Sequence, residues 1–152
     1  MTLPPQTARL RTLADVVERL AQPDGDLHRA MVSASPNMPS ETMAAGLGLS
    51  LGGWDLATLK RWFSSARARI GTAVPPVHCV VILGGVLPPS HVQALAYPWL
   101  LGARLSVKVP SRDPGCPTLL CNALGDGIEI ISRSDVPSAL ADADAVVVVG
   151  DD

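Results

Sequence analysis

A lysine at the end of an apolar run is the residue of this chain best suited to bind an anionic ligand. Lys108 lies near the end of the otherwise apolar run LSVKV, where its ammonium group must reach solvent or an anion to escape the cost of burial. Ser111 and Arg112 follow, and an arginine guanidinium can bind a phosphate through two hydrogen bonds. Lys108 could instead extend along the surface to reach water, and Arg112 could be a solvated loop residue. The pattern predicts a phosphate site and leaves the solvated alternative open.

Glycines follow two other apolar runs. Gly84 and Gly85 come directly after 77–83, a short β-branched run typical of a strand buried on both faces of a parallel sheet, and Gly150 follows 145–149. In α/β proteins, strand ends of this kind meet helix amino ends where phosphorylated ligands bind. GGVLPPS matches neither GxGxxG nor GxxxxGK[ST], and its prolines lack backbone donors. A plain strand-to-helix turn is therefore the alternative.

The elements that position these residues alternate between strand and helix from Val77 onward. Ser90 is expected to cap the first of these helices, and Gly102 to end it. Right-handed crossovers fold such a series into a doubly wound, mostly parallel sheet, so the predicted fold class is α/β with a Rossmann-like sheet. The predicted strands are 77–83, 104–109, 127–131 and 145–149, and the predicted helices are 90–101, 116–124 and 134–141.

Residues 1–74 are predicted to form a helical segment ahead of a βα nucleotide-binding part at 75–152. Apolar residues between Leu10 and Leu20 follow a helical repeat, and Ser40 and Asp55 are expected to cap two further helices. The stretch GTAVPP marks the boundary, because residues before proline disfavour helix and the following composition is β-branched. These amphipathic helices require a surface on which to pack.

Composition narrows the classes of function. The chain has 152 residues, of which 47% are hydrophobic, enough for one domain with a substantial core. Its net charge is −2 and only 3% of residues are aromatic, which argues against binding to nucleic acid. The amino terminus does not resemble a signal peptide, and no stretch reaches membrane-spanning length. A cytoplasmic protein is the expectation.

The cysteines and histidines form no recognisable catalytic or metal-binding pattern. Cys79, Cys116 and Cys121 are an odd set without the spacing of a zinc site or a disulfide framework. Cys79 is expected in the core, and Cys116 is the thiol close enough to a helix amino end to be weighed as reactive, although most free cysteines pack as small hydrophobes. His78 and His91 have no carboxylate partner nearby in sequence. No catalytic residue and no metal site is predicted.

Two segments carry a family resemblance. VILGGVLPPSHVQALAYPWLLGARLSVKVPSRDP and ADADAVVVVGDD resemble the nucleotide-binding half of the LuxC-type acyl-CoA reductases, relatives of the aldehyde dehydrogenase superfamily. PNMPSETMAAGLGLSLGGWDLATLKRWF is similar to the segment that precedes this half. In these oxidoreductases an acyl group passes from CoA to a cysteine, and NADPH reduces the thioester to a fatty aldehyde. The resemblance implies an NADP(H)-binding amino-terminal portion of such an enzyme, with an incomplete aldehyde dehydrogenase-type fold.

The resemblance also implies roles for individual residues. Lys108 resembles the lysine that contacts the adenosine ribose or its phosphate, and Gly150 resembles the glycine that approaches the cofactor. Ser111 stands where NAD-preferring relatives often carry a carboxylate, so with Arg112 adjacent NADP is expected over NAD. Gly85 replaces an asparagine that can stabilise an oxyanion. The nucleophilic cysteine of the family lies downstream of this sequence.

Two hypotheses follow. In the first, the chain is the cofactor-binding part of an acyl-CoA reductase, inactive alone and acting on acyl-CoA only together with a carboxyl-terminal part. In the second, it is a stand-alone, non-catalytic remnant that binds a nucleotide or a partner. The apolar strand at 145–149 suggests self-association through an exposed sheet edge.

Overall fold

Four parallel strands form one sheet in the order β3-β2-β1-β4. The structure is a computed structural model that describes residues 4–85 and 88–150. Consecutive strands β1 to β3 step to one side, and the chain then returns to place β4 against the other side of β1. The α/β class and the parallel sheet are confirmed. The strands are β1 (His78–Leu83), β2 (Arg104–Lys108), β3 (Ile128–Ile130) and β4 (Ala145–Val149).

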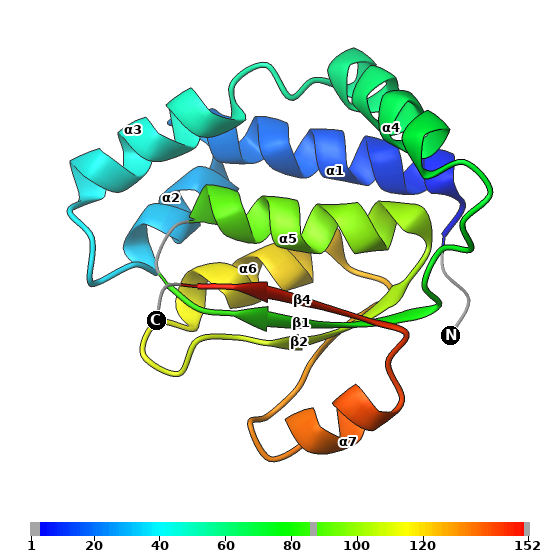
Figure 1. The fold of residues 1–152 in the computed structure, drawn as a ribbon. Helices are drawn as coiled ribbons and strands as arrows, with labels where there is room; N and C mark the ends of the chain where they lie inside the picture. Colours follow the sequence, from blue (N-terminus) through cyan, green and yellow to red (C-terminus); the bar gives the residue numbers. More distant parts are fainter. Residues whose placement is uncertain (1–3, 86–87, 151–152) are drawn as a thin grey trace.

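The helices divide unequally between the two faces of the sheet (Figure 1). α5 and α6 lie on one face with α1 to α4 stacked beyond them, and α7 alone lies on the other, beneath the amino-terminal half of the strands. The helices are α1 (Gln6–Ala21), α2 (Asp26–Ser33), α3 (Ser40–Leu51), α4 (Leu56–Ile70), α5 (Pro88–Leu101), α6 (Gly115–Leu124) and α7 (Val136–Ala141). None of the helices in the described part of the chain has the length and apolarity needed to cross a membrane.

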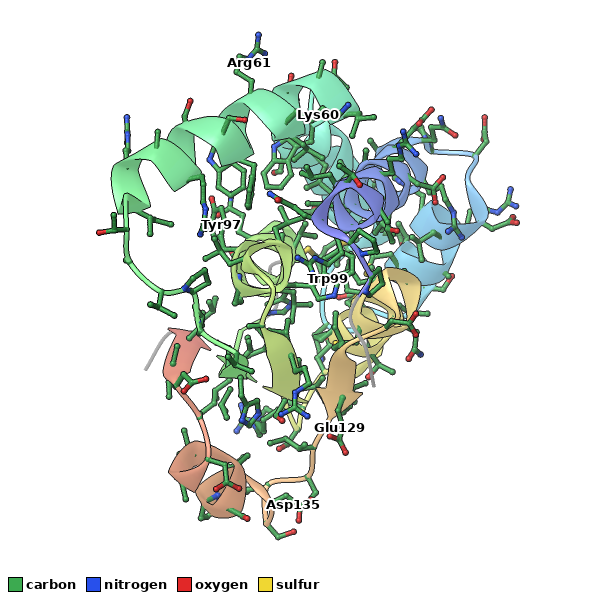
Figure 2. The ribbon with its side chains drawn as sticks, turned by 90° about the vertical axis from the view of Figure 1, so that its right-hand side faces the viewer. Lys60, Arg61, Tyr97, Trp99, Glu129 and Asp135 are labelled. Carbon is green, nitrogen blue, oxygen red and sulfur yellow. The ribbon has the colours of Figure 1, made fainter. Side chains whose placement is uncertain are left out.

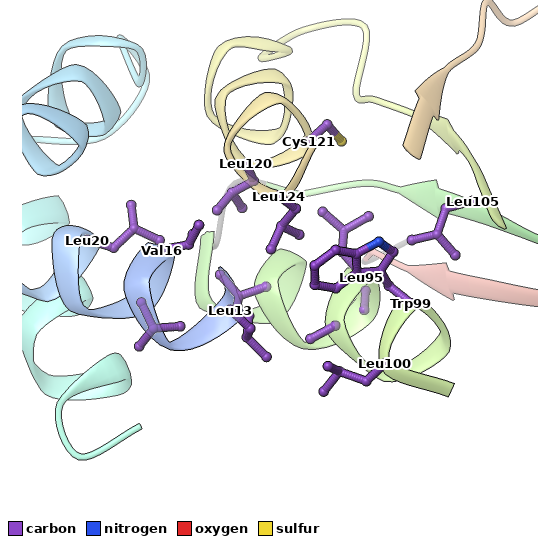
Figure 3. Close-up of a cluster of buried hydrophobic side chains, with 14 of the residues drawn as sticks. Leu13, Val16, Leu20, Leu95, Trp99, Leu100, Leu105, Leu120, Cys121 and Leu124 are labelled. Carbon is purple, nitrogen blue, oxygen red and sulfur yellow. The ribbon is translucent and has the colours of Figure 1, made fainter. Parts of the chain in front are cut away.

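One core joins the helical segment to the sheet. The apolar repeat of α1 buries Leu13 and Leu20 against side chains from α5 and α6, such as Leu95 and Leu120 (Figure 3). Trp99 of α5 is buried in the same cluster, and its Nε1 donates to the Asp126 carbonyl oxygen at 2.9 Å. Because apolar burial drives folding, the amphipathic helices find their packing surface on the layer that covers the sheet.

Strand alternation gives the sheet two different faces. The covered face consists of Cys79, Val81, Leu83, Leu105 and Val107, all nearly inaccessible and part of the core. The open face carries the alternate residues, which the strand register places side by side. α7 covers only part of this face. The open face is formed by His78, Val80, Ile82, Arg104, Ser106, Lys108, Glu129, Val146 and Val148.

Two expected helix caps require correction and one helix was not predicted, whereas Asp55 is confirmed as a cap. Its carboxylate accepts a hydrogen bond from the Thr58 amide at 2.7 Å. Ser40 is the first residue of α3 and makes no capping bond, while Ser90 lies inside α5, which begins at Pro88. Helix α2 was not predicted, because its eight residues follow a turn and are too short for a clear apolar repeat.

Candidate nucleotide site

Two glycines meet where the sheet changes its winding direction, between β1 and β4. The Gly84 amide donates to the Val149 carbonyl oxygen, which prolongs strand pairing by one residue. A Cβ atom on Gly150 would lie 3.1 Å from the Gly84 Cα, and one on Gly84 would lie 3.3 Å from the Gly150 Cα. Both positions therefore favour glycine. This switch point is the part of a doubly wound sheet that binds nucleotides.

Gly85 is required by the shape of the turn itself. Its φ is 71°, a left-handed conformation that side chains other than those of asparagine and aspartate rarely adopt. The residue is exposed at the carboxyl edge of the sheet. It contributes backbone freedom and no side-chain donor, so the oxyanion role of an asparagine has no counterpart here.

Lys108 lies at the same edge as these glycines. It is the last residue of β2, aligned with Ile82 of β1, which is in turn aligned with Val148 of β4. Two strand spacings amount to roughly 10 Å, so a ligand that joins Lys108 to the end of β4 must span that distance. β2 has neighbours on both sides, and the half-buried Lys108 therefore lies within the sheet rather than on its lateral edge.

The charges around Lys108 leave it available for an anion. Ion pairs in the described part of the chain join Arg19 to Asp15 and Arg29 to Asp26, both on the helical segment. Lys108 takes part in neither of them. Its ammonium group therefore has no carboxylate competing with an incoming phosphate within the described residues.

Ser111 and Arg112 are less well placed than Lys108. Both are exposed in the loop between β2 and α6, and neither makes a side-chain hydrogen bond or an ion pair to another described residue. They reach the carboxyl edge of the sheet only because their loop begins there. The structure thus brings Gly84 and Gly150 together, sets Lys108 at the same edge, and leaves the other two in an unconstrained loop.

His91 lies buried beneath the glycine turn, a position that the sequence did not predict. His91 is 2% exposed, and its Nε2 lies 3.0 Å from the Gly84 carbonyl oxygen, to which it donates when that nitrogen carries the proton. Its Nδ1 has no hydrogen-bond partner in the described part of the chain. Burial lowers the pKa of His91, opposed by the Gly84 hydrogen bond and by the charge of Asp113. The side chain is therefore a neutral support under Gly84 at neutral pH.

Asp113 connects this turn to the helical segment. Its side chain is buried, and its Oδ2 accepts a hydrogen bond from the Ser35 hydroxyl at 3.5 Å. Cys116 lies close to this pair: its thiol donates to the Met31 carbonyl oxygen at 3.3 Å, and Ser35 and the Asp113 charge both influence its pKa. The partners Ser35 and Asp113 are 78 residues apart, so no local spacing could reveal them. His91 has no carboxylate near it in the sequence, but in the folded chain the negative charge of Asp113 acts on it.

All three thiols are unsuited to nucleophilic catalysis. Burial raises the pKa of Cys116 to about 11, with the Asp113 charge adding to this and the Ser35 hydrogen bond opposing it. Burial likewise raises the pKa of Cys121 to about 12, and it raises the pKa of Cys79. Because the thiolate is the nucleophile, these buried thiols act as core residues. The described residues contain no cluster of His, Cys, Asp and Glu that could hold a metal ion.

Comparisons with known proteins add no family assignment to this geometry. No family model matches the chain, and neither the curated proteins nor the solved structures give a significant match. The case for a function therefore depends on the site itself.

Proposed function

We propose that the chain binds NADP(H) across the carboxyl edge of its sheet, as the cofactor-binding portion of an acyl-CoA reductase. The observation that carries this proposal is the contact between Gly84 and Gly150 at the switch point, with Lys108 ending the strand next to β1. Switch points of doubly wound sheets are where nucleotides bind, and a lysine without a described carboxylate partner supplies the charge that a phosphate requires.

The residues at this edge fit a dinucleotide in two respects. The backbones of Gly84 and Gly150 approach so closely that side chains would obstruct them, which leaves main chain exposed to a ligand. Lys108 would bind a phosphate or ribose hydroxyl, and Arg112 would favour the 2′-phosphate of NADP over NAD. Bound NADPH supplies a hydride. The protein's own contribution is binding and orientation, and His91 holds the Gly84 carbonyl in place beneath the site.

The role of Lys108 can be tested by substitution. Lys60 is the matched control, because Lys60 and Lys108 are the only lysines of the chain. Calorimetric titration with NADPH should show binding that weakens by about 1.5–3 kcal/mol in Lys108→Ala, the worth of a charge-assisted hydrogen bond. Lys60→Ala, on the exposed surface of α4, should bind as the unaltered chain does. Unchanged affinity in Lys108→Ala would refute its role, and equal affinity for NADH and NADPH would refute the preference.

The acyl-transfer half of the reaction needs a nucleophile that the described elements do not provide. Cys79, Cys116 and Cys121 are buried and protonated at neutral pH, so none can accept an acyl group from CoA. We therefore expect no NADPH oxidation when this chain alone is mixed with an acyl-CoA. Turnover by the purified chain would contradict this assignment of roles.

A second candidate function is favoured by the open face. Val146 and Val148 on β4 are 48% and 69% exposed, and among the described strands β4 has only β1 as a neighbour. An exposed apolar edge strand is suited to pairing with another protein segment. In this alternative the chain is a non-catalytic binding module. Titration with NADPH distinguishes the two candidate functions, because a binding module needs no affinity for NADPH whereas a cofactor-binding portion does.

A further inference from the structure

An aromatic cavity lies on the side of α5 away from the sheet. It has a volume of about 160 Å³ and is formed by α1, α4, α5 and the turn before α4. The chain has three tryptophans, one tyrosine and one phenylalanine, and three of these five aromatic residues line this one cavity. Its lining residues are Leu13, Trp54, Thr58, Leu59, Trp62, Ala96 and Tyr97.

The lining follows from a stripe along α4. Trp54, Thr58 and Trp62 are spaced four residues apart, so they fall on one side of the helix and its leading turn, and all three are half-buried. Opposite them, Tyr97 leaves α5 toward α4, while Trp99 leaves it on another side (Figure 2). The rings of Trp62 and Tyr97 are 4.6 Å apart and tilted by 36°. These two rings form an aromatic wall.

The cavity is open to solvent rather than sealed inside the core. Tyr97 is 41% exposed, and Trp54 and Trp62 keep part of their surface accessible. A side chain that only fills the core would bury its rings completely, as Trp99 does. A small molecule can therefore reach these aromatic side chains from solvent.

The size and charge of the cavity define the class of ligand. An apolar cavity of about 150 Å³ binds benzene, so the present one accommodates a single ring or a short alkyl chain. The side chains that line it carry no charge. Lys60 and Arg61 lie on the outer side of α4, away from Tyr97 (Figure 2). An anionic ligand would find no counter-ion here, and burying its charge would be costly.

We propose that this cavity is a binding site for a small uncharged apolar molecule, either one aromatic ring or a chain of about six carbons. The site lies across α5 from the sheet, so it is separate from the proposed nucleotide site and does not depend on it. Trp54 and Trp62 line the cavity, so binding of a ligand should change tryptophan emission.

The test is a titration of the full chain with benzyl alcohol and 1-hexanol, followed by tryptophan emission and by chemical shifts of the indole protons. Both probes should bind saturably, and benzoate should bind at least tenfold more weakly than benzyl alcohol. Ala96→Leu fills the cavity and should weaken binding at least tenfold, whereas Ala123→Leu makes the same change on α6, outside the cavity, and should leave it unchanged.

Trp62→Ala provides a second variant if Ala96→Leu does not fold, because Trp62 is only half-buried and its loss removes the aromatic wall. It should also weaken benzyl alcohol binding at least tenfold. Linear, non-saturable changes in emission would overturn the proposal. So would binding that survives in both variants, and tighter binding of benzoate would overturn the uncharged class of ligand.

Discussion

The covered face and the open face of the sheet consist of alternate residues of the same strands, yet they differ in what lies against them. Leu105 and Val107 point into a continuous core formed with α5 and α6. Val146 and Val148 point outward, where α7 is the sole helix in the described part of the chain. Stability is therefore concentrated on one face. Lys108, the candidate phosphate ligand, lies on the other, where a side chain is free to bind.

Removing a side chain from each face gives the largest expected contrast. Leu105→Ala leaves a cavity in the core and should lower the free energy of unfolding by about 2–5 kcal/mol. Val148→Ala, on the open face, should change it by less than about 0.5 kcal/mol. Urea unfolding measures both values. Equal losses would mean that the open face is covered in solution.

Alanine substitutions at two glycines should change stability in opposite directions. Gly150→Ala would set a Cβ 3.1 Å from the Gly84 Cα and should cost about 1–3 kcal/mol of stability through overpacking. Gly46→Ala in α3 meets no atom within 4 Å and should stabilise the chain by about 0.5–1 kcal/mol, since alanine favours helix. Thermal melting compares the two. A harmless Gly150→Ala would show that the contact at the switch point is loose.

The exposed valines should also affect association. Covering Val146 and Val148 in a second molecule contributes less than the roughly 1.5–3 kcal/mol of full burial per side chain, so association should be weak and concentration-dependent. Light scattering over a dilution series should show a falling apparent mass, and Val148→Lys should abolish the dependence. Val74→Lys, a fully exposed valine before β1, is the control. A monomer at every concentration would contradict self-association through β4.

The order of strands and helices could be predicted because local signals marked it. Apolar β-branched runs ended just before Gly84 and Gly150, and a helical pattern followed each of the first three predicted strands, so the alternation from β1 to β4 could be predicted. Helix starts were predicted less well. Ser40 and Ser90 looked like caps, but prolines just before them begin or precede the helices instead. The prediction for Asp55 was correct because its carboxylate accepts a hydrogen bond from the Thr58 amide, three residues ahead.

The candidate site could be predicted only where its residues follow strands. The sequence pointed to Gly84, Lys108 and Gly150 because Lys108 ends a strand and each glycine directly follows one, and parallel strands end at one edge. It could not point to the Asp113 charge that acts on His91, or to the packing of Trp62 on Tyr97, because these residues lie on elements distant in sequence. Such contacts depend on helix packing, which local patterns do not specify.

His91 gives the smallest expected effect, which is on the pH dependence of stability. Burial holds its pKa in the folded chain below the usual 6.5, so the unfolded chain binds a proton more readily. Stability should therefore be complete above about pH 6.5 and should decline as the pH falls below that value. Asp55 and Asp144 have lowered pKa values, and their contributions are lost only at more acidic pH, below their usual 3.8.

His91→Gln isolates this contribution, because glutamine keeps an N–H donor for the Gly84 carbonyl oxygen and does not titrate. Urea unfolding between pH 5 and 7.5 should show a shallower pH dependence in the variant, and an NMR titration of the unaltered chain should place the pKa of His91 below 6.5. An identical pH dependence of stability in both proteins would show that the protonation of His91 does not influence the glycine turn.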